Sequence, residues 1–418
     1  MSAAVLARAN RSLRPAAALS ATLVVLVGAG GCGKSSSPPS EAQGGSETVV
    51  TRTIAVGTAA TATRNTTRLG GGGAVADAAA VARTAYPGLT AATRPQAVVI
   101  ADAGNWQAAL VASALASAPL GAPLLYAHGK LPLVSAQTLA GLRPTGASAL
   151  GGAQVLLLGA AIEAPTGYRT RGATSANPYS LAVSVAQLLS IVRGAEPRQV
   201  IVVAAEAPPA LAMPAAGLAA QSGAPILFVT RRSVPAATAA ELRSLGRPSI
   251  YTVGSTAISE AVLAKLSRFG PVKRAESRAG EDATPAGNAV AVSRFVDGSF
   301  GWGVVEPGHG LVFANATRPF DAPAAAILSA TGDYAPLLLL EEADAVPAVL
   351  SAYLSDIQPA APKSQPVKGV YNHGWLIGGE RAISAQAQAE LDAMLEIAPH
   401  SSPGPGGQAG EEAPTASE

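Results

Sequence analysis

Residues 121–126 read Gly-Ala-Pro-Leu-Leu-Tyr, and similar hexapeptides return at 223–228 (Gly-Ala-Pro-Ile-Leu-Phe) and 334–339 (Tyr-Ala-Pro-Leu-Leu-Leu). The copies recur roughly every 100–110 residues, which is longer than the ~20–50-residue units of solenoid proteins. A chain of 418 residues has room for three domains of this size. The repeat therefore predicts one α/β module that is used three times.

The segments around each hexapeptide follow one order. A Gly-rich turn leads into an Ala/Val-rich helix, an apolar strand, a small-residue helix, the Ala-Pro strand, a further helix and a strand that ends in glycine. The turns lie at 68–70, 171–172 and 278–282, and the glycine-ended strands at 155–159, 250–254 and 374–379. Strands that are apolar throughout and alternate with helices predict parallel sheets covered by helices. The predicted fold class is α/β, with three tandem doubly wound parallel-sheet modules, whose ligands would bind beyond the carboxyl ends of the strands.

The N-terminal residues have the pattern of an export signal. Three arginines lie within the first 14 residues, an apolar stretch covers 16–27, and small residues precede the only cysteine, Cys32. The apolar stretch is shorter than the ~20 residues of a membrane span. The pattern resembles a bacterial lipoprotein signal and predicts a signal peptide over 1–31, lipidation of Cys32, and a Ser/Pro-rich tether over 32–52. Residues 400–418 are predicted to form a disordered acidic tail.

Composition argues against several functions. Cleavage before Cys32 would remove three arginines and no acid, changing the formal net charge from +2 to −1, so we expect no global attraction to nucleic acid. Residues 28–35 match the P-loop pattern G-x-x-x-x-G-K-S, but Pro38 and Pro39 follow where that motif needs a helix, so we expect no nucleotide. The four histidines lack metal-ligand spacing and no G-x-S-x-G elbow occurs. We therefore expect no metal, no cofactor and no catalytic residues.

Motifs in all three modules resemble the cell wall-binding repeat type 2 family. The matching segments are Gly121–Leu125 in the first module, Gly223–Leu227 and Gly254–Ser259 in the second, and Pro319–Ala322 and Gly378–Ser384 in the third. The resemblance spans roughly residues 54–398, and we place the modules at 53–165, 166–275 and 276–399. It implies three modules packed around a pseudo-threefold axis in a secreted protein that attaches non-covalently to an anionic cell-wall polymer.

Two features of the family pattern are degenerate here. The second arginine of the opening motif is absent from all three copies, with Ala283 in its place in the third, and the aspartate of F-x-D-A-L survives only as Asp321. Ala108 and Pro209 stand at that position in the other two copies. If these residues touch polymer in the family, this chain binds weakly, binds another ligand, or serves as a scaffold.

Candidate polymer contacts are arginines and lysines on a rigid edge, because guanidinium groups suit phosphate and carboxylate. Arg68, Arg171 and Arg278 precede the module-opening glycines and match the family; the alternative is a solvated arginine or a salt bridge between modules. Lys130, Arg231 and Arg232 follow the Ala-Pro strands. Asp321 would either orient an arginine or cap the following helix.

The sequence thus favours a non-catalytic, extracytoplasmic protein of the cell membrane or cell wall that binds anionic wall polymer and is tethered by lipid at Cys32. Three weak sites on one rigid body would gain avidity toward a repeating polymer. The alternatives are a solute-binding lipoprotein, which would normally have two lobes around one cleft, and an envelope enzyme.

Overall fold

The computed structural model describes residues 61–160, 162–275, 283–330, 335–360 and 370–398, which all belong to one compact unit, Ala55–Glu418. The predicted signal peptide, Cys32, the tether, Arg278 and the acidic tail lie outside the described residues. Among the described residues, no helix is both long and apolar enough to cross a membrane.

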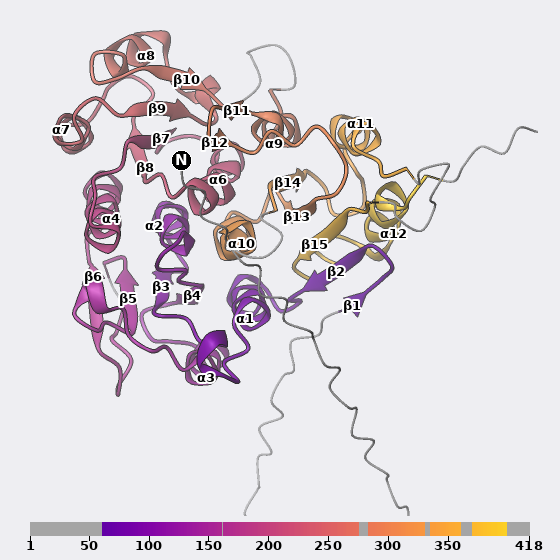
Figure 1. The fold of residues 1–418 in the computed structure, drawn as a ribbon, viewed down its shortest axis with the longest axis horizontal. Helices are drawn as coiled ribbons and strands as arrows, with labels where there is room; N and C mark the ends of the chain where they lie inside the picture. The colour runs from indigo at the N-terminus through magenta and orange to yellow at the C-terminus, as the bar shows by residue number, and fades with distance from the viewer. Residues whose placement is uncertain (1–60, 161, 276–282, 331–334, 361–369, 399–418) are drawn as a thin grey trace, which may run out of the picture. The chain divides into compact units, whose positions relative to one another are not determined.

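Three parallel sheets alternate with helices, so the predicted α/β class is confirmed (Figure 1). Sheet I has the strand order β4-β3-β5-β6, sheet II β10-β9-β7-β8, and sheet III β1-β2-β15-β13-β14, in which only β1 is antiparallel. Sheet I consists of β3 (Val98–Asp102), β4 (Leu124–Ala127), β5 (Val155–Leu158) and β6 (Thr170–Ala173). Sheet II consists of β7 (Gln199–Ala204), β8 (Ile226–Val229), β9 (Ser249–Thr252) and β10 (Val272–Arg274). Sheet III consists of β1 (Thr61–Ala62), β2 (Thr66–Leu69), β13 (Gly310–Asn315), β14 (Leu337–Leu340) and β15 (His373–Ile377).

The helices fall into three sets with equivalent positions in the modules. The opening helices are α1 (Ala74–Ala85), α4 (Pro178–Arg193) and α9 (Pro285–Arg294). The central helices are α2 (Trp106–Ala112) with its 3-10 continuation η2 (Ser113–Ala116), α5 (Pro209–Ala212) with α6 (Pro214–Ser222), and α10 (Asp321–Ala330). The outer helices are α3 (Leu133–Leu142), α7 (Ala236–Ser244), α8 (Glu260–Leu266), α11 (Ala348–Asp356) and α12 (Ala385–Leu395).

Short elements complete the described fold. They are a hairpin of β11 (Val296–Asp297) and β12 (Phe300–Gly301), and the 3-10 turns η1 (Ala91–Thr93), η3 (Ser148–Leu150) and η4 (Ser255–Ala257). Local sequence explains the helix ends well. In α4, for example, the Asn177 side chain accepts hydrogen bonds from the backbone N–H groups of Tyr179 and Ser180, Pro178 is the first helical residue, and Gly194 ends the helix with φ 66°.

The three central helices contact one another pairwise, as packing around a threefold axis requires (Figure 1). Their small residues allow this close approach. A Cβ on Gly217 of α6 would lie 2.9 Å from Ser329 Oγ of α10, and that hydroxyl donates to the carbonyl of Ala335 at 2.6 Å. Ala-rich helices therefore build the common core, which agrees with the low aromatic content of 4%.

The last residue of the repeated hexapeptide joins neighbouring modules. Tyr126 donates from its hydroxyl to the carbonyl of Phe320 at 2.6 Å, and the two rings meet edge to face at 5.4 Å. Phe228, its counterpart in the second module, meets Trp106 of the first module in the same way at 6.1 Å. In these two cases the terminal side chain of the hexapeptide packs against the segment between the first strand and the central helix of the preceding module.

The turns predicted at 68–70 and 171–172 overlap strands, β2 and β6, that pair with the preceding module's sheet. The turn predicted at 278–282 lies outside the described residues, and the strand that precedes it is β10. Strand β6 pairs with β5, β10 with β9, and β2 with β15, in parallel register. The pairing of β2 with β15 joins the N-terminal end of the described chain to its C-terminal end, so that the first and third modules are linked through one sheet. These strands have three or four residues and mixed polarity, so their alternation is too short to distinguish them from turns.

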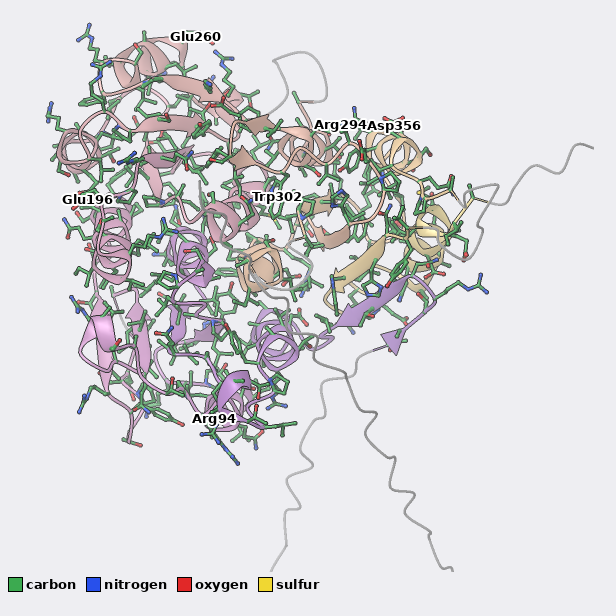
Figure 2. All side chains as sticks on the ribbon, viewed as in Figure 1. Arg94, Glu196, Glu260, Arg294, Trp302 and Asp356 are labelled. Atoms are coloured by element: carbon green, nitrogen blue, oxygen red, sulfur yellow. The ribbon has the colours of Figure 1, made fainter. Side chains whose placement is uncertain are left out.

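Polar contacts join two helices at the outer surface. Arg294 at the end of α9 pairs with Asp356 at the end of α11, and the Arg294 guanidinium also lies 5.0 Å from the centre of the Tyr353 ring (Figure 2). The Tyr353 hydroxyl is hydrogen-bonded to Ser293 at 2.7 Å. These contacts hold the outer helix α11 on the opening helix α9.

Candidate functional site

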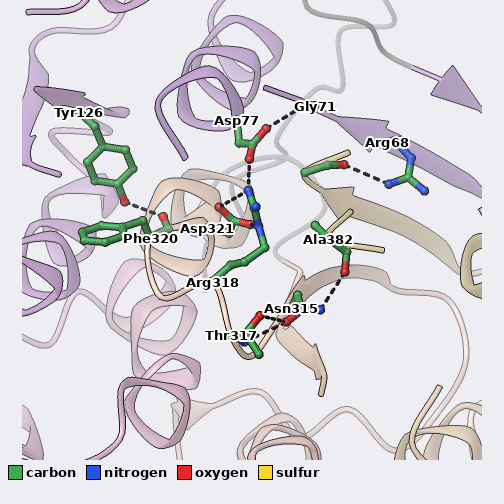
Figure 3. A network of polar contacts seen from close by, with 11 residues as sticks. Arg68, Gly71, Asp77, Tyr126, Asn315, Thr317, Arg318, Phe320, Asp321 and Ala382 are labelled. Carbon is green, nitrogen blue, oxygen red and sulfur yellow. Dashed lines mark hydrogen bonds and ion pairs between the residues drawn. The ribbon is translucent and has the colours of Figure 1, made fainter. Parts of the chain in front are cut away.

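The carboxyl ends of β13 and β15 carry a cluster of charged groups with Arg318 at its centre (Figure 3). Arg318 Nε lies 2.5 Å from Asp321 Oδ2, and its Nη2 lies 2.5 Å from Asp77 Oδ2. Both carboxylate side chains are fully buried, whereas the Arg318 side chain is 27% exposed. One guanidinium therefore serves two carboxylates that come from opposite ends of the chain.

Local sequence places each member of the cluster. Asp321 is the first residue of α10, and Arg318 precedes it by three residues in the loop after β13. Asn315 fixes this loop, because its Oδ1 accepts from the backbone N–H of Thr317 at 2.9 Å and its Nδ2 donates to the carbonyl of Ala382 at 2.8 Å. Asp321 pairs with an arginine, which is one of the two roles considered for it, and it also lies in the first turn of α10, where a negative charge faces the positive end of the helix.

Asp77 reaches the cluster from the first turn of α1. Its Oδ1 accepts a hydrogen bond of 2.7 Å from the backbone N–H of Gly71, while its Oδ2 faces Arg318. Gly70 has φ 103°, and a Cβ there would lie 2.1 Å from Asp77 Oδ1. The glycine-rich opening segment is thus needed to bring the chain over this carboxylate.

Burial dominates the protonation of the two carboxylates. Desolvation raises the pKa of Asp321 to about 7, although Arg318 acts in the opposite direction, and the charge of Asp77 raises it further. The pKa of Asp77 is also raised, mainly by desolvation, against the lowering effects of the Gly71 N–H and of Arg318. Near neutral pH the cluster therefore carries less negative charge than two free aspartates would.

Arg68 lies beside this cluster and is buried, with 6% of its surface exposed. Its Nε and Nη2 donate to Gln388 Oε1 at 3.1 and 2.8 Å, and its Nη1 donates to the carbonyl of Gly378 at 3.0 Å. Gln388 in turn donates to Thr66 Oγ1 at 3.0 Å. Desolvation lowers the pKa of Arg68. Its side chain thus links β2 to α12 and to the end of β15.

A pocket of about 620 Å³ opens next to Arg318. Its wall combines the opening glycines with the segment after β15: Gly71, Gly72, Gly73, Arg318, Gly379, Glu380, Arg381 and Ala382. The two segments approach closely, since a Cβ on Gly379 would lie 3.0 Å from the Cα of Gly71. The pocket offers polar backbone and both signs of charge, so it suits a polar ligand better than an apolar one. Among the described residues, no group of three or more His, Cys, Asp and Glu side chains is placed to hold a metal ion.

The other predicted polymer contacts are not brought together with Arg68. Arg171 lies in the middle of β6 and is exposed. Lys130 follows β4, and Arg231 and Arg232 follow β8, all three exposed at the carboxyl ends of their sheets. The polymer-binding roles of these residues and of Arg278 stay predictions.

Arg318 was absent from the sequence-based candidates. The available signal was its spacing to Asp321, since residues three apart at a helix start can form an ion pair. Asp77 could not be paired with them from sequence, because it lies more than 240 residues from Arg318.

Solved structures with a similar arrangement include two proteins of Clostridium difficile. Cwp6 matches with a TM-score of 0.58 and 17% identity over 76% of this chain and 46% of its own. Cwp8 matches with a TM-score of 0.59 and 17% identity over 79% of this chain and 52% of its own. This chain shares their fold. It spans about half the length of either protein, and identity at this level shows nothing beyond the fold.

No protein-family model matches the chain, and no curated protein matches it in sequence. The resemblance to the cell wall-binding repeat type 2 family therefore rests on the motifs quoted above and on the fold.

Proposed function

We propose that the chain is a non-catalytic cell-envelope protein that binds an anionic cell-wall polymer through its three-sheet body. The observation that carries the proposal is the set of exposed cations Lys130, Arg231 and Arg232 at the carboxyl ends of β4 and β8, within a fold shared with Cwp6 and Cwp8. Parallel sheets bind ligands at this edge. The family motifs supply the class of ligand.

Sedimentation of the purified full chain with isolated Gram-positive cell walls tests the proposal. We expect co-sedimentation that weakens as salt rises, because exposed charges are screened. Replacing Lys130, Arg231 and Arg232 with Gln should weaken binding by roughly tenfold or more, because each lost charge contact costs about 0.5 kcal/mol or more of binding free energy.

The matched control replaces Arg143, Arg169 and Arg198 with Gln. These three arginines are also exposed, but Arg143 ends α3, and Arg169 and Arg198 directly precede β6 and β7 at the amino ends of those strands. The change in net charge is the same in both variants. Absence of wall binding by the unmodified chain, or equal loss in the two variants, contradicts the proposal.

The proposal includes a lipid tether at Cys32, supported by the basic and apolar segments that precede it. Growth of a Gram-positive host with a labelled fatty acid should label the unmodified chain and leave the Cys32→Ser variant unlabelled. Equal labelling of both, or of neither, rejects the tether without affecting the polymer-binding proposal.

A further inference from the structure

A second pocket, of about 480 Å³, is lined by residues of α7 and of the segment before it, and by residues in and just after α8. Three cationic side chains line it, namely Arg243, Lys265 and Arg268, and all three are exposed. No acidic residue is part of its wall, and none of the three cations forms an ion pair with a described residue. We call this feature the α7–α8 groove.

The groove is a shaped site as well as a charged one. The Arg243 guanidinium carbon lies 5.3 Å from the centre of the Phe269 ring, which restricts the arginine to one side of the groove. Ala239 forms part of the wall between the helices, and Ser233 and Val234 form the end nearest the start of α7. A restrained arginine loses less freedom when it binds an anion than a freely moving one would.

The third module shows that the charge is not a consequence of the fold. Counting from the proline that precedes each outer helix, Pro235 and Pro347, the residue equivalent to Arg243 is Ser355. Counting from the serines that cap the next helices, Ser259 and Ser384, the equivalents of Lys265 and Arg268 are Glu390 and Ala393. The same two-helix geometry thus carries three cations in the second module and none of them in the third.

The groove also continues into the predicted edge contacts. Ser233 at one end of the groove directly follows Arg231 and Arg232, which are exposed after β8. A chain-like ligand lying along α7 would therefore meet cations at both ends of that helix. A single small anion would use only one end.

We infer that the α7–α8 groove binds a linear polymer that carries phosphate or carboxylate groups along its length, held by Arg243, Lys265 and Arg268. For the identity of that polymer the inference rests on the proposed function. Guanidinium and ammonium groups recognise both kinds of anion, so the shared chemistry is a repeating negative charge. The second module would then hold one segment of the polymer, while the other modules contribute through their sheet edges.

The test uses the full chain, isothermal titration and four probes: a glycerol phosphate oligomer, an oligogalacturonate, neutral dextran and a single-stranded oligonucleotide. We expect one or both anionic oligomers to bind and dextran not to bind. The triple variant Arg243→Gln, Lys265→Gln and Arg268→Gln should lose about tenfold or more in affinity. The negative slope of log K against log salt should become shallower by roughly two, because the variant lacks three charges that neutralise phosphate groups.

The Arg143, Arg169 and Arg198 to Gln triple variant is the control, because it removes equal charge from elsewhere. Circular dichroism and thermal unfolding verify that both variants fold. Equal affinity loss in the two variants, no loss in the groove variant, dextran binding, or tighter binding of a single-stranded oligonucleotide than of either polymer overturns the inference.

The two proposals fail separately. If the unmodified chain sediments with walls and the groove variant sediments equally well, the groove inference is wrong and the proposed function stands. If the unmodified chain does not sediment with walls, the proposed function is wrong. A selective loss of oligomer binding in the groove variant would then still support an anion site between α7 and α8.

Discussion

The joint between β2 and β15 differs from the joint between β5 and β6, although both attach an opening strand to the preceding module's sheet. We call the first joint the closing seam. There Arg68 is buried and donates to Gln388 and to the carbonyl of Gly378, and Gln388 donates to Thr66. Next to it, Asp77 and Asp321 both pair with Arg318. At the second joint, Arg171 is exposed and Gly172 is its neighbour in β6.

The sheet register explains why similar-looking arginines differ. Arg68 pairs with Leu376, one residue before the final residue of β15, whereas Gly172 holds the matching place opposite Leu157 of β5. Arg171 is therefore offset by one residue, which turns its side chain to the other face of the sheet. Counted from the glycine that follows each strand, Thr252 of β9 matches Leu376 of β15, since they lie two residues before Gly254 and Gly378. Its partner Arg274 forms an ion pair with Glu260 near the molecular surface (Figure 2).

Chain connectivity gives a reason for the heavier polar network at the closing seam. Strands β5 and β6 are joined by roughly ten residues, but roughly 300 residues separate β2 from β15. Loop-closure entropy makes the longer closure about 3 kcal/mol more costly. The hydrogen bonds of buried Arg68 to Gln388 and to the carbonyl of Gly378 offset part of that cost.

Removal of Arg318 should have the largest effect. Arg318→Leu leaves the buried carboxylates of Asp77 and Asp321 without their common partner, and we expect a loss of about 3–5 kcal/mol in unfolding free energy. Arg274→Leu, at an exposed ion pair of another joint, should cost about 0.5 kcal/mol. Urea unfolding followed by circular dichroism measures both. Similar losses would remove the distinction between the seam and the other joints.

The pH dependence of stability sharpens the comparison next. The folded-state pKa of Asp321 is about 7, above the usual value of 3.8, so the folded state holds this proton more tightly than the unfolded state. Unfolding free energy should therefore fall as pH rises from about 4 to about 7. Asp321→Asn removes this titration, so the variant should gain stability relative to the unmodified chain over that range, by up to about 3–4 kcal/mol. Parallel stability curves for the two proteins would exclude a raised pKa at Asp321.

Arg68 and Arg171 provide a matched pair of substitutions. Arg68→Met keeps the stem of the side chain but leaves Gln388 Oε1 and the carbonyl of Gly378 without their donor, so we expect a loss of about 2–3 kcal/mol. Arg171→Met changes an exposed position and should cost less than about 0.5 kcal/mol. Thermal unfolding compares them directly. An equal loss would show that the register difference has no energetic consequence.

The sequence predicted the fold better than the candidate site. Apolar runs such as Val98–Asp102 and the three hexapeptides located most sheet strands, because their burial on both faces leaves a continuous apolar pattern. The opening strand Thr66–Leu69 overlaps the turn predicted at 68–70, because its partner strand is distant and its residues are mixed in polarity. The Asp77–Arg318 contact depends on that same pairing, so local pattern could not reveal it.

The smallest effect is expected at the exposed rim of the closing seam, where Arg64 pairs with Glu396 at 2.8 Å. The hydrogen bond from Arg64 lowers the pKa of Glu396 in the folded state. The pair therefore stabilises the fold at pH values above the pKa that Glu396 has in the unfolded chain, and this stabilisation is lost as the pH falls through the lower pKa of the folded state. Glu396→Gln should therefore reduce stability slightly at neutral pH and low salt, and not measurably in about 0.5 M salt, because exposed pairs are screened. A salt-independent loss as large as that of Arg68→Met would mean that the rim, rather than the buried groups, holds the ends of the chain together.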